Sequence, residues 1–311
     1  PFFWLGDTAW ELFHRLSEDE ATHYLENRAA KGFTVIQCVL LAELHGLTVP
    51  NAEGELPLFD LDPTQPNDAY FDLVDRVVAK GNALGLTMAL LPTWGDKFHL
   101  KWGMGPEVFT PENARFYGRW VAERYQDADV VWVLSGDRQP EDDEDRAIID
   151  AMAAGIREVV GTSQLITSHP QGGYSSSTEF NDRDWLDFNF FQSGHSYRDE
   201  PNYQRIQSDR ALTPVRPVFD GEPCYEDHPV NWKPDEQGWF SDFDTRRAGW
   251  WSMLAGAAGH TYGHHAVWQM WQPGRDPISV VRTPWQEALD YPGAFQAGVM
   301  RQVFESVAWQ R

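Results

Sequence analysis

The chain has 311 residues, of which 42% are hydrophobic, and this supplies enough apolar side chain for a sizeable buried core. Its formal net charge of −22 argues against a nucleic acid or an anionic membrane as a partner, because both are negatively charged and would be repelled. The longest apolar runs contain polar residues and fall short of the roughly 20 residues that span a bilayer, so no membrane insertion is expected.

Apolar strand-like runs alternate with helical patterns along the chain. Ser17 and Glu20 form a capping box, Gly32 ends the same helix, and Thr110-Pro111 opens a later one. The expected strands are residues 2–7, 33–41, 86–92, 130–134, 165–167, 186–191, 218–219 and a run within 260–270. The expected helices are residues 17–31, 67–84, 110–126, 142–160, 202–211, 242–258 and 283–307, the last of them broken or kinked at Pro292.

This alternation predicts an α/β fold, and specifically a single (β/α)8 TIM barrel over residues 1–311. Nearly every strand-like run is followed by a helical pattern, without a linker or low-complexity break. The strands are continuously apolar, as in a parallel sheet that is buried on both faces. The alternative is an open doubly wound sheet, but no G-x-G-x-x-G or other phosphate-binding loop follows the first strand.

In such a barrel the carboxyl ends of all strands surround one mouth, where catalysis occurs. The sequence places polar and aromatic side chains there, whereas the strand interiors stay apolar. The candidates for substrate binding are Asp7, Trp10, Glu43, His45, Trp94, Lys97, His169, Gln192, His195, Glu226, His264 and Trp268. For any single histidine, a hydrogen-bonding role within a loop network is an equally good interpretation.

Glu222 lies where the pattern predicts the end of the seventh strand. Residues 218–219 form a short apolar run, Gly221 relaxes the backbone, and Pro223 removes a backbone donor and biases Glu222 away from helix. Taken alone, such an acidic segment is more typical of a surface turn. A second strand-like stretch ends at Asp137, however, and a barrel would bring the two carboxylates to opposite sides of one mouth.

Two facing carboxylates in unequal environments are what cleavage of a glycosidic bond requires. One is protonated and assists the leaving group, while the other is ionised and attacks the anomeric carbon or activates water. We therefore predict Asp137 as the acid/base and Glu222 as the nucleophile. An Arg138 side chain facing the pocket would lower the pKa of Asp137. The structural alternatives are a helix cap or a salt bridge to Arg138 for Asp137, and a supporting contact for Glu222.

Other catalytic chemistries have weaker support in the sequence. A zinc site would need ligands such as His169, His195, His264 and His265, but no H-E-x-x-H or comparably close spacing is present. The sequence also has no G-x-S-x-G segment of the kind that carries a nucleophilic serine. We therefore expect neither a metal nor a cofactor.

Three segments carry a resemblance to a known family. They are W-L-G-D-T-A-W at residues 4–10, W-V-L-S-G-D at 132–137 and F-D-G-E-P-C-Y-E at 219–226. These segments resemble the apiosidase-like glycoside hydrolases, as do the Trp pair at 250–251 and the Gly-His pair at 263–264. The resemblance implies a (β/α)8 barrel, often followed by a small β domain, which we expect to be absent from this chain.

The resemblance also implies site residues. In the family an Asp after the fourth strand and a Glu after the seventh are the catalytic pair, and these positions correspond to Asp137 and Glu222. Related barrel glycosidases more usually have a Glu after an Asn at the end of strand four. The Ser-Gly-Asp at residues 135–137 departs from that pattern and matches this family instead. The resemblance does not specify the sugar, because such families diverge in sugar preference.

The leading hypothesis is a retaining, exo-acting glycosidase that cleaves a plant- or algal-type polysaccharide or oligosaccharide. Long loops at residues 44–67, 171–184 and 225–242 would wall the pocket and favour chain ends. Several of the 15 tryptophans lie at strand ends or in loops, where their flat apolar faces suit sugar rings. The competing hypothesis is a non-catalytic barrel that binds carbohydrate or protein. The sugar, its anomer and the oligomeric state are left open.

Two further features concern the compartment. Cys38 and Cys224 both lie in predicted strands, and we expect two buried free thiols rather than a disulfide or a thiolate metal site. No signal peptide is present, but the chain begins at Pro1 inside a strand-like run, so we expect the natural protein to start earlier. Secreted, periplasmic and cytoplasmic locations are all compatible with these features.

Overall fold

Eight strands form the centre of the protein, whose computed structural model describes residues 2–309. The strands are β1 (Trp4–Thr8), β2 (Val35–Leu41), β3 (Thr87–Thr93), β4 (Val130–Leu134), β5 (Ile166–Ser168), β6 (Asn189–Phe191), β7 (Val218–Asp220) and β8 (Gly259–Tyr262). Their order is β5-β4-β3-β2-β1-β8-β7-β6, and the paired neighbours are parallel. The two ends of this order meet where Asp187 N–H donates to the Ile166 carbonyl at 2.9 Å. The strands thus form the nearly closed (β/α)8 barrel that the sequence predicts.

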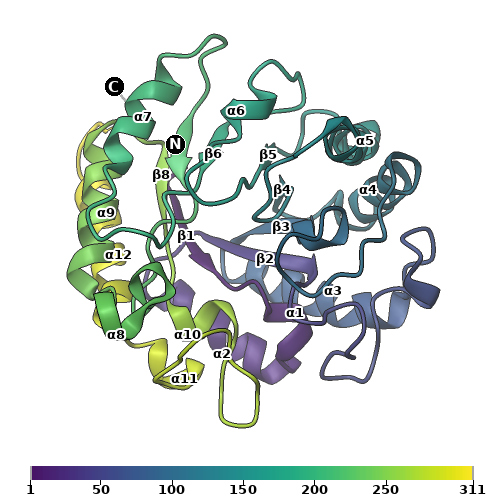
Figure 1. Ribbon diagram of the computed structural model, residues 1–311, viewed down its shortest axis with the longest axis horizontal. Helices are drawn as coiled ribbons and strands as arrows, with labels where there is room; N and C mark the ends of the chain where they lie inside the picture. The colour runs from purple at the N-terminus through teal and green to yellow at the C-terminus, as the bar shows by residue number, and fades with distance from the viewer. Residues whose placement is uncertain (1, 310–311) are drawn as a thin grey trace.

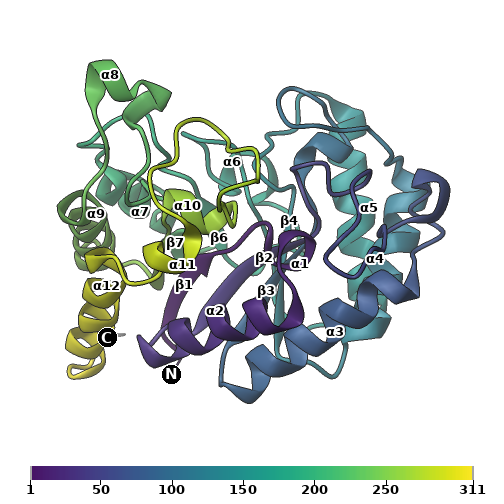
Figure 2. The same cartoon turned by 90° about the horizontal axis from the view of Figure 1, so that it is seen from below.

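Helices surround this barrel on all sides (Figure 1). They are α1 (Leu12–Arg15), α2 (Glu18–Ala30), α3 (Asp68–Ala83), α4 (Pro111–Tyr125), α5 (Asp143–Val160), α6 (Ser177–Phe180), α7 (Asn202–Arg210), α8 (Pro234–Gln237), α9 (Asp242–Leu254), α10 (His265–Trp268), α11 (Trp285–Ala288) and α12 (Pro292–Glu305). Three short 3-10 turns are η1 (Phe59–Leu61), η2 (Gly95–Lys97) and η3 (Val230–Trp232). Figure 2 shows the loops that carry α6 and α8 projecting at one end of the barrel.

The expected helix signals are present where the sequence places them. Ser17 and Glu20 form the predicted capping box at the start of α2, and Pro111 occupies the first turn of α4. Pro292 separates α11 from α12, which confirms the predicted break. The run at 260–270 is mostly not a strand, since β8 ends at Tyr262 and α10 follows.

An aromatic cluster fills the barrel beneath the site. The ring of Phe219 lies 4.5 Å from Trp4, 5.2 Å from Phe188 and 5.5 Å from Phe190, measured between centroids. A Cβ on Gly221 would lie 1.9 Å from Phe190, so only glycine fits there. Gly221 is therefore needed for close packing against a ring, rather than for the backbone freedom expected from the sequence.

Both cysteines are free and buried, as predicted. Cys38 lies in β2, whereas Cys224 lies in the loop after β7 and not in a strand. Among residues 2–309, none of the helices combines the length and the apolar character that crossing a bilayer requires.

Candidate active site

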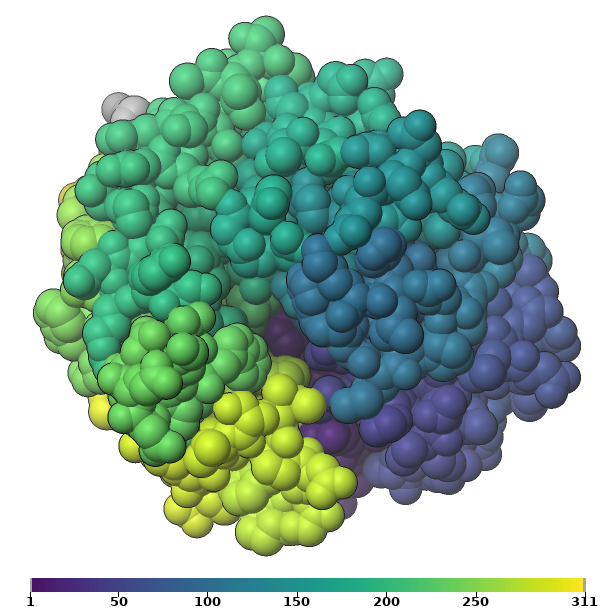
Figure 3. All heavy atoms as spheres, in the orientation of Figure 1, coloured from purple at the N-terminus to yellow at the C-terminus, as the bar shows by residue number. Residues whose placement is uncertain are grey.

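A cavity of about 710 Å³ opens at the carboxyl end of the barrel. Figure 3 shows the hollow at the centre of this face, with purple N-terminal residues at its floor and later loops around its rim. It is lined by Trp10, Glu43, Leu44, Trp94, Trp102, Gly103, Met104, Asp137, Gly172, Gly173, Gln192, Ser193, Gly194, His195, Ser196, Tyr197, Glu200, Glu222, Tyr225, His228, Trp232, Trp268 and Ile278. No Lys or Arg of the described part of the chain is in this lining, so its ionisable side chains are carboxyls, imidazoles and two tyrosines.

Asp137 is aimed into the cavity by an unusual turn at the end of β4. Ser135, Gly136 and Asp137 have φ values of 72°, 65° and 55°, so three consecutive residues adopt the left-handed region. Such a backbone costs on the order of 1–3 kcal/mol for each non-glycine residue, and it persists only where the surroundings enforce it. Here the Ser135 hydroxyl lies 2.6 Å from that of Ser168, and a Cβ on Gly136 would lie 2.8 Å from the Thr93 carbonyl.

The surroundings of Asp137 favour its protonated form. Burial, and next the negative charge of Glu222, raise the pKa of Asp137 to about 6, against smaller opposing effects of His169 and Arg138. The Arg138 guanidinium donates to the backbone carbonyls of His99 and of Asp137 itself, at 2.9 and 2.8 Å. Arg138 therefore lowers the pKa in the predicted direction, but it does not dominate.

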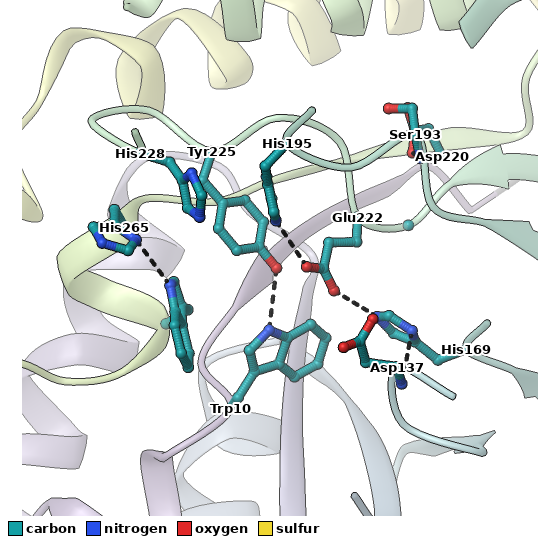
Figure 4. Close-up of polar contacts among 12 residues, drawn as sticks. Trp10, Asp137, His169, Ser193, His195, Asp220, Glu222, Tyr225, His228 and His265 are labelled. Atoms are coloured by element: carbon teal, nitrogen blue, oxygen red, sulfur yellow. Dashed lines mark hydrogen bonds and ion pairs between the residues drawn. The ribbon is translucent and has the colours of Figure 1, made fainter. Parts of the chain in front are cut away.

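Glu222 lies between two histidines, as Figure 4 shows. His169 Nε2 is 2.7 Å from Oε2, and His195 Nε2 is 3.0 Å from Oε1. Burial alone would raise the pKa of Glu222, but the two hydrogen bonds outweigh it and lower the pKa to about 2. Glu222 is therefore a buried carboxylate held in its ionised form.

His169 connects the two carboxyl-bearing turns. Its Nδ1 lies 3.2 Å from the backbone nitrogen of Asp137 and 2.8 Å from the Pro170 carbonyl. A neutral imidazole with its proton on Nε2 can accept the Asp137 N–H, whereas an imidazolium donates to Pro170. In both forms Nε2–H donates to Glu222, whose hydrogen bond and charge raise the pKa of His169 against the effect of burial. The ring packs between Trp10, Trp94 and Phe190.

His195 is held by the loop that follows β6. Asp220, at the end of β7, accepts hydrogen bonds from the Ser193 hydroxyl at 2.6 Å and backbone N–H at 3.2 Å. The His195 ring stacks on His228, with centroids 4.2 Å apart, and lies 4.4 Å from the Tyr225 ring. Asp220 thus supports the site from outside the cavity.

Tyr225 and Trp10 complete the floor beside Glu222 (Figure 4). The Trp10 indole N–H donates to the Tyr225 hydroxyl at 3.1 Å. Burial and the neighbouring charge of Glu222 raise the pKa of Tyr225 well above its usual range. The hydroxyl therefore stays protonated and can donate a hydrogen bond next to the Glu222 carboxylate.

Glu43 brings a third carboxyl to the cavity wall. Desolvation, and then the charges of Asp96 and Asp137, raise the pKa of Glu43 well above its usual range. The chain beside it is fixed because the Leu44 N–H donates to the buried Glu11 carboxylate at 3.0 Å. The shift favours a neutral carboxyl, which can donate a hydrogen bond to a sugar hydroxyl.

The structure brings most of the predicted residues together in this cavity. The predicted residues in the lining are Trp10, Glu43, Trp94, Asp137, Gln192, His195, Glu222 and Trp268. His169 lies directly behind them and contacts both carboxyl-bearing segments.

Besides His169, five predicted residues lie outside the lining. Asp7 faces α2 and accepts from Arg28 and Tyr24, both at 2.6 Å. Lys97 is buried against Asp96 at 2.8 Å, and His45 is exposed. Glu226 accepts from the Tyr262 hydroxyl at 2.6 Å and from the Gly293 N–H at 3.0 Å, and His264 caps α10. The contacts of the other four residues indicate supporting roles within the fold, whereas the exposed His45 has no such contact within the described residues.

Other lining residues were not predicted, among them the aromatic and ionisable side chains of Trp102, Tyr197, Glu200, Tyr225, His228 and Trp232. The sequence signal for Trp102 and Tyr225 was present, since one is a loop tryptophan and the other closely follows Glu222. Of the long loop at 44–67, only Leu44 reaches the lining, whereas the loops after β3 and β6 contribute more than expected.

No group of three or more His, Cys, Asp or Glu side chains is placed to hold a metal ion within residues 2–309.

The family model described as apiosidase-like, catalytic domain, matches residues 1–311. The chain belongs to the apiosidase-like catalytic domain family. It is similar to a solved structure called "Glycoside hydrolase", with 32% identity and a TM-score of 0.88 over 99% of this chain and 71% of that one. It is also similar to a family 5 glycoside hydrolase from Bacteroides vulgatus ATCC 8482, with 31% identity, a TM-score of 0.89, and coverage of 99% and 68%. No curated protein sequence matches it.

A more distant likeness supports the fold alone. The endo-1,4-beta-D-mannanase of Thermotoga petrophila RKU-1 shares 13% identity at a TM-score of 0.64, over 97% of this chain and all of that one.

Membership of the apiosidase-like family makes this protein a glycoside hydrolase with a carbohydrate substrate. It also disfavours the competing hypothesis of a non-catalytic barrel.

Proposed function

We propose that this apiosidase-like barrel is a retaining, exo-acting glycosidase, with Asp137 as acid/base and Glu222 as nucleophile. The observation that carries the proposal is the unequal surroundings of two carboxyls in one cavity: Glu222 lies between the His169 and His195 N–H donors, which lower its pKa, whereas burial and the charge of Glu222 raise the pKa of Asp137. Pairs of titratable groups whose environments push their pKa values apart are typical of an acid and its partner base or nucleophile.

The proposed reaction has two steps. Ionised Glu222 attacks the anomeric carbon, the glycosidic C–O bond breaks, and Asp137 gives its proton to the departing oxygen. Asp137, now ionised, then takes a proton from water, whose oxygen attacks the same carbon and releases Glu222. The hydrogen bonds from His169 and His195 suit this role, because they fix the Glu222 carboxylate without protonating it.

The cavity also indicates the kind of sugar at the cleavage point. Its acidic side chains are Glu43, Asp137, Glu200 and Glu222, of which Glu222 is held ionised, and the described lining contains no Lys or Arg to pair with an anionic group. A uronate or sulfated ring would therefore be repelled, and a neutral sugar is favoured. Trp10, Trp94, Trp102, Trp232 and Trp268 supply flat apolar faces for it.

The proposal is tested with a panel of aryl glycosides and plant- and algal-type oligosaccharides, including pectic ones, whose products are followed by NMR. We expect single sugars released from chain ends, with the first product carrying the same anomeric configuration as the substrate. Products of inverted configuration would overturn the retaining mechanism, and internal cleavage into mixed oligosaccharides would overturn exo action.

The activity is expected to have an acidic optimum. Asp137 must be protonated to act as the acid, so kcat/KM should fall as pH rises through its pKa of about 6. Glu222 must be ionised, so its pKa of about 2 leaves it competent throughout this range. The profile is measured from about pH 4 to about pH 9, about one unit beyond the range of roughly pH 5–8 in which stability tends to be highest, with the melting temperature followed at each pH. A flat profile across pH 5–7 (about one unit either side of the Asp137 pKa) would contradict the assignment.

A further inference from the structure

A half-exposed tryptophan at the cavity rim contacts the proposed acid. The Trp102 indole N–H donates to Asp137 Oδ2 at 2.7 Å, although 38% of the Trp102 surface is exposed. The other carboxyl oxygen, Oδ1, accepts no hydrogen bond within the described residues. Trp102 comes from the loop between β3 and α4 and also lines the cavity.

We propose that Trp102 is a positioning residue for the acid, which fixes the orientation of the Asp137 carboxyl and determines which of its oxygens carries the proton. The inference rests on the proposed role of Asp137. A neutral carboxyl accepts an indole N–H through its carbonyl oxygen. With Oδ2 engaged in this way, the proton resides on Oδ1, which is free to deliver it to the departing oxygen of a substrate.

The loop that carries Trp102 is anchored by a buried ion pair. Asp96 and Lys97 are fully buried, with Lys97 Nζ 2.8 Å from both carboxylate oxygens. Asp96 Oδ2 also accepts the N–H groups of Met104 and Gly105, each at 2.8 Å. These bonds tie the segment just after Trp102 to the base of the loop. Lys97 is buried and does not line the cavity, so we expect it to affect the site only by holding the loop that carries Trp102.

Arg138 holds the indole from its other side. Its guanidinium carbon lies 4.0 Å from the centroid of the Trp102 ring, and it donates to the Trp102 carbonyl. Arg138, which follows Asp137 in the sequence, thus holds the Trp102 indole that orients the Asp137 carboxyl. An exposed aromatic side chain held by stacking and two hydrogen-bonded atoms is suited to positioning, because little rotamer freedom remains.

Besides burial, which raises it most, four ionisable groups and one hydrogen bond determine the pKa of Asp137. Glu222 and Glu43 disfavour its ionisation, His169 and Arg138 favour it, and so does the Trp102 hydrogen bond. Loss of that bond should therefore raise the pKa of Asp137. Since the acid works only while protonated, the alkaline limb of the activity profile should then move to higher pH.

The test compares Trp102→Phe with the wild type on two aryl glycosides of one sugar. With a poor leaving group such as phenol, we expect kcat/KM to fall about tenfold, because a misoriented acid transfers its proton less well. With 2,4-dinitrophenol, which departs without a proton, the loss should be under about twofold. The midpoint of the alkaline limb of the kcat/KM profile should move to higher pH by roughly half a unit to one unit.

Trp185→Phe is the matched control. The Trp185 indole donates to Asp150 Oδ1, also at 2.7 Å, and lies outside the cavity. This variant should leave both the leaving-group dependence and the pH limb unchanged, and melting temperatures verify that both variants fold.

Equal losses on both substrates with an unmoved limb would overturn the inference, since Trp102 would then be only a platform for the sugar. Asp137→Ala separates this failure from that of the proposed function. If Asp137→Ala is inactive on the phenyl glycoside while Trp102→Phe behaves as a platform variant, only the positioning role is wrong. If Asp137→Ala keeps full activity there, the assignment of the acid itself is wrong.

Discussion

Glu222→Gln is expected to lower kcat by roughly 10⁴-fold or more, while the barrel stays folded. An amide cannot attack the anomeric carbon, so the covalent step is lost. The amide has nearly the same shape and keeps one oxygen as an acceptor, so it can retain a bond to either His169 or His195. The measurement is kcat on the best substrate of the panel, together with the melting temperature.

Glu179→Gln serves as the matched control for this substitution. Glu179 lies in α6, outside the cavity, and pairs with Arg146 at 2.9 Å. A loss confined to Glu222→Gln would support a chemical role. Activity near the wild-type level in Glu222→Gln, with the fold intact, would contradict the assignment of Glu222 as the nucleophile.

The architecture could be predicted because it depends on features that are local in sequence. Continuous apolar runs, capping signals and the alternation of strand and helix identify the barrel, and the barrel in turn brings Asp137 and Glu222 to one mouth. What a position at a strand end does not reveal is the direction of the side chain, since successive residues point to opposite faces. Asp7 illustrates this, because it turns outward to Arg28 on α2.

Loop geometry was less predictable than strand ends, because it depends on contacts between distant residues. Lys97 carries a charge near the mouth, but Asp96 draws it into a buried pair that organises the next loop. Trp102 consequently reaches Asp137 across 35 positions of sequence. No local pattern encodes such a contact.

The unequal state of the two carboxyls also depends on contacts between different strands. His169 follows β5 and His195 follows β6, yet both donate to Glu222 after β7. Asp137 has no comparable pair of donors, so burial and the charge of Glu222 decide its state. The ionised Glu222 therefore helps to keep Asp137 protonated, whereas the ionised form of Glu222 depends on the two histidines.

Asp137→Ala should show a loss that depends on the leaving group and is partly reversed by azide. For phenyl or alkyl glycosides we expect kcat/KM to fall roughly 10²- to 10⁴-fold, because the departing oxygen no longer receives a proton. For 2,4-dinitrophenyl glycosides the first step should survive, but release of the sugar from Glu222 should be slow without a base. Azide is small enough to enter the space left by the carboxyl. Because it is already an anion, it can attack without a general base. It would attack the anomeric carbon as the ester bond to Glu222 breaks.

The readout is the turnover rate with and without azide, and the NMR spectrum of the glycosyl azide. Two displacements at one carbon give net retention, so the azide should have the configuration of the substrate. Asp209→Asn is the control, since Asp209 accepts from Ser175 and Ser177 away from the cavity and should give an azide-insensitive enzyme. An azide product of inverted configuration would mean that azide replaces Asp137 in a single displacement, so that Asp137 is the nucleophile or the base that activates water and not the acid. A wild-type rate on the phenyl glycoside would remove Asp137 from the chemistry altogether.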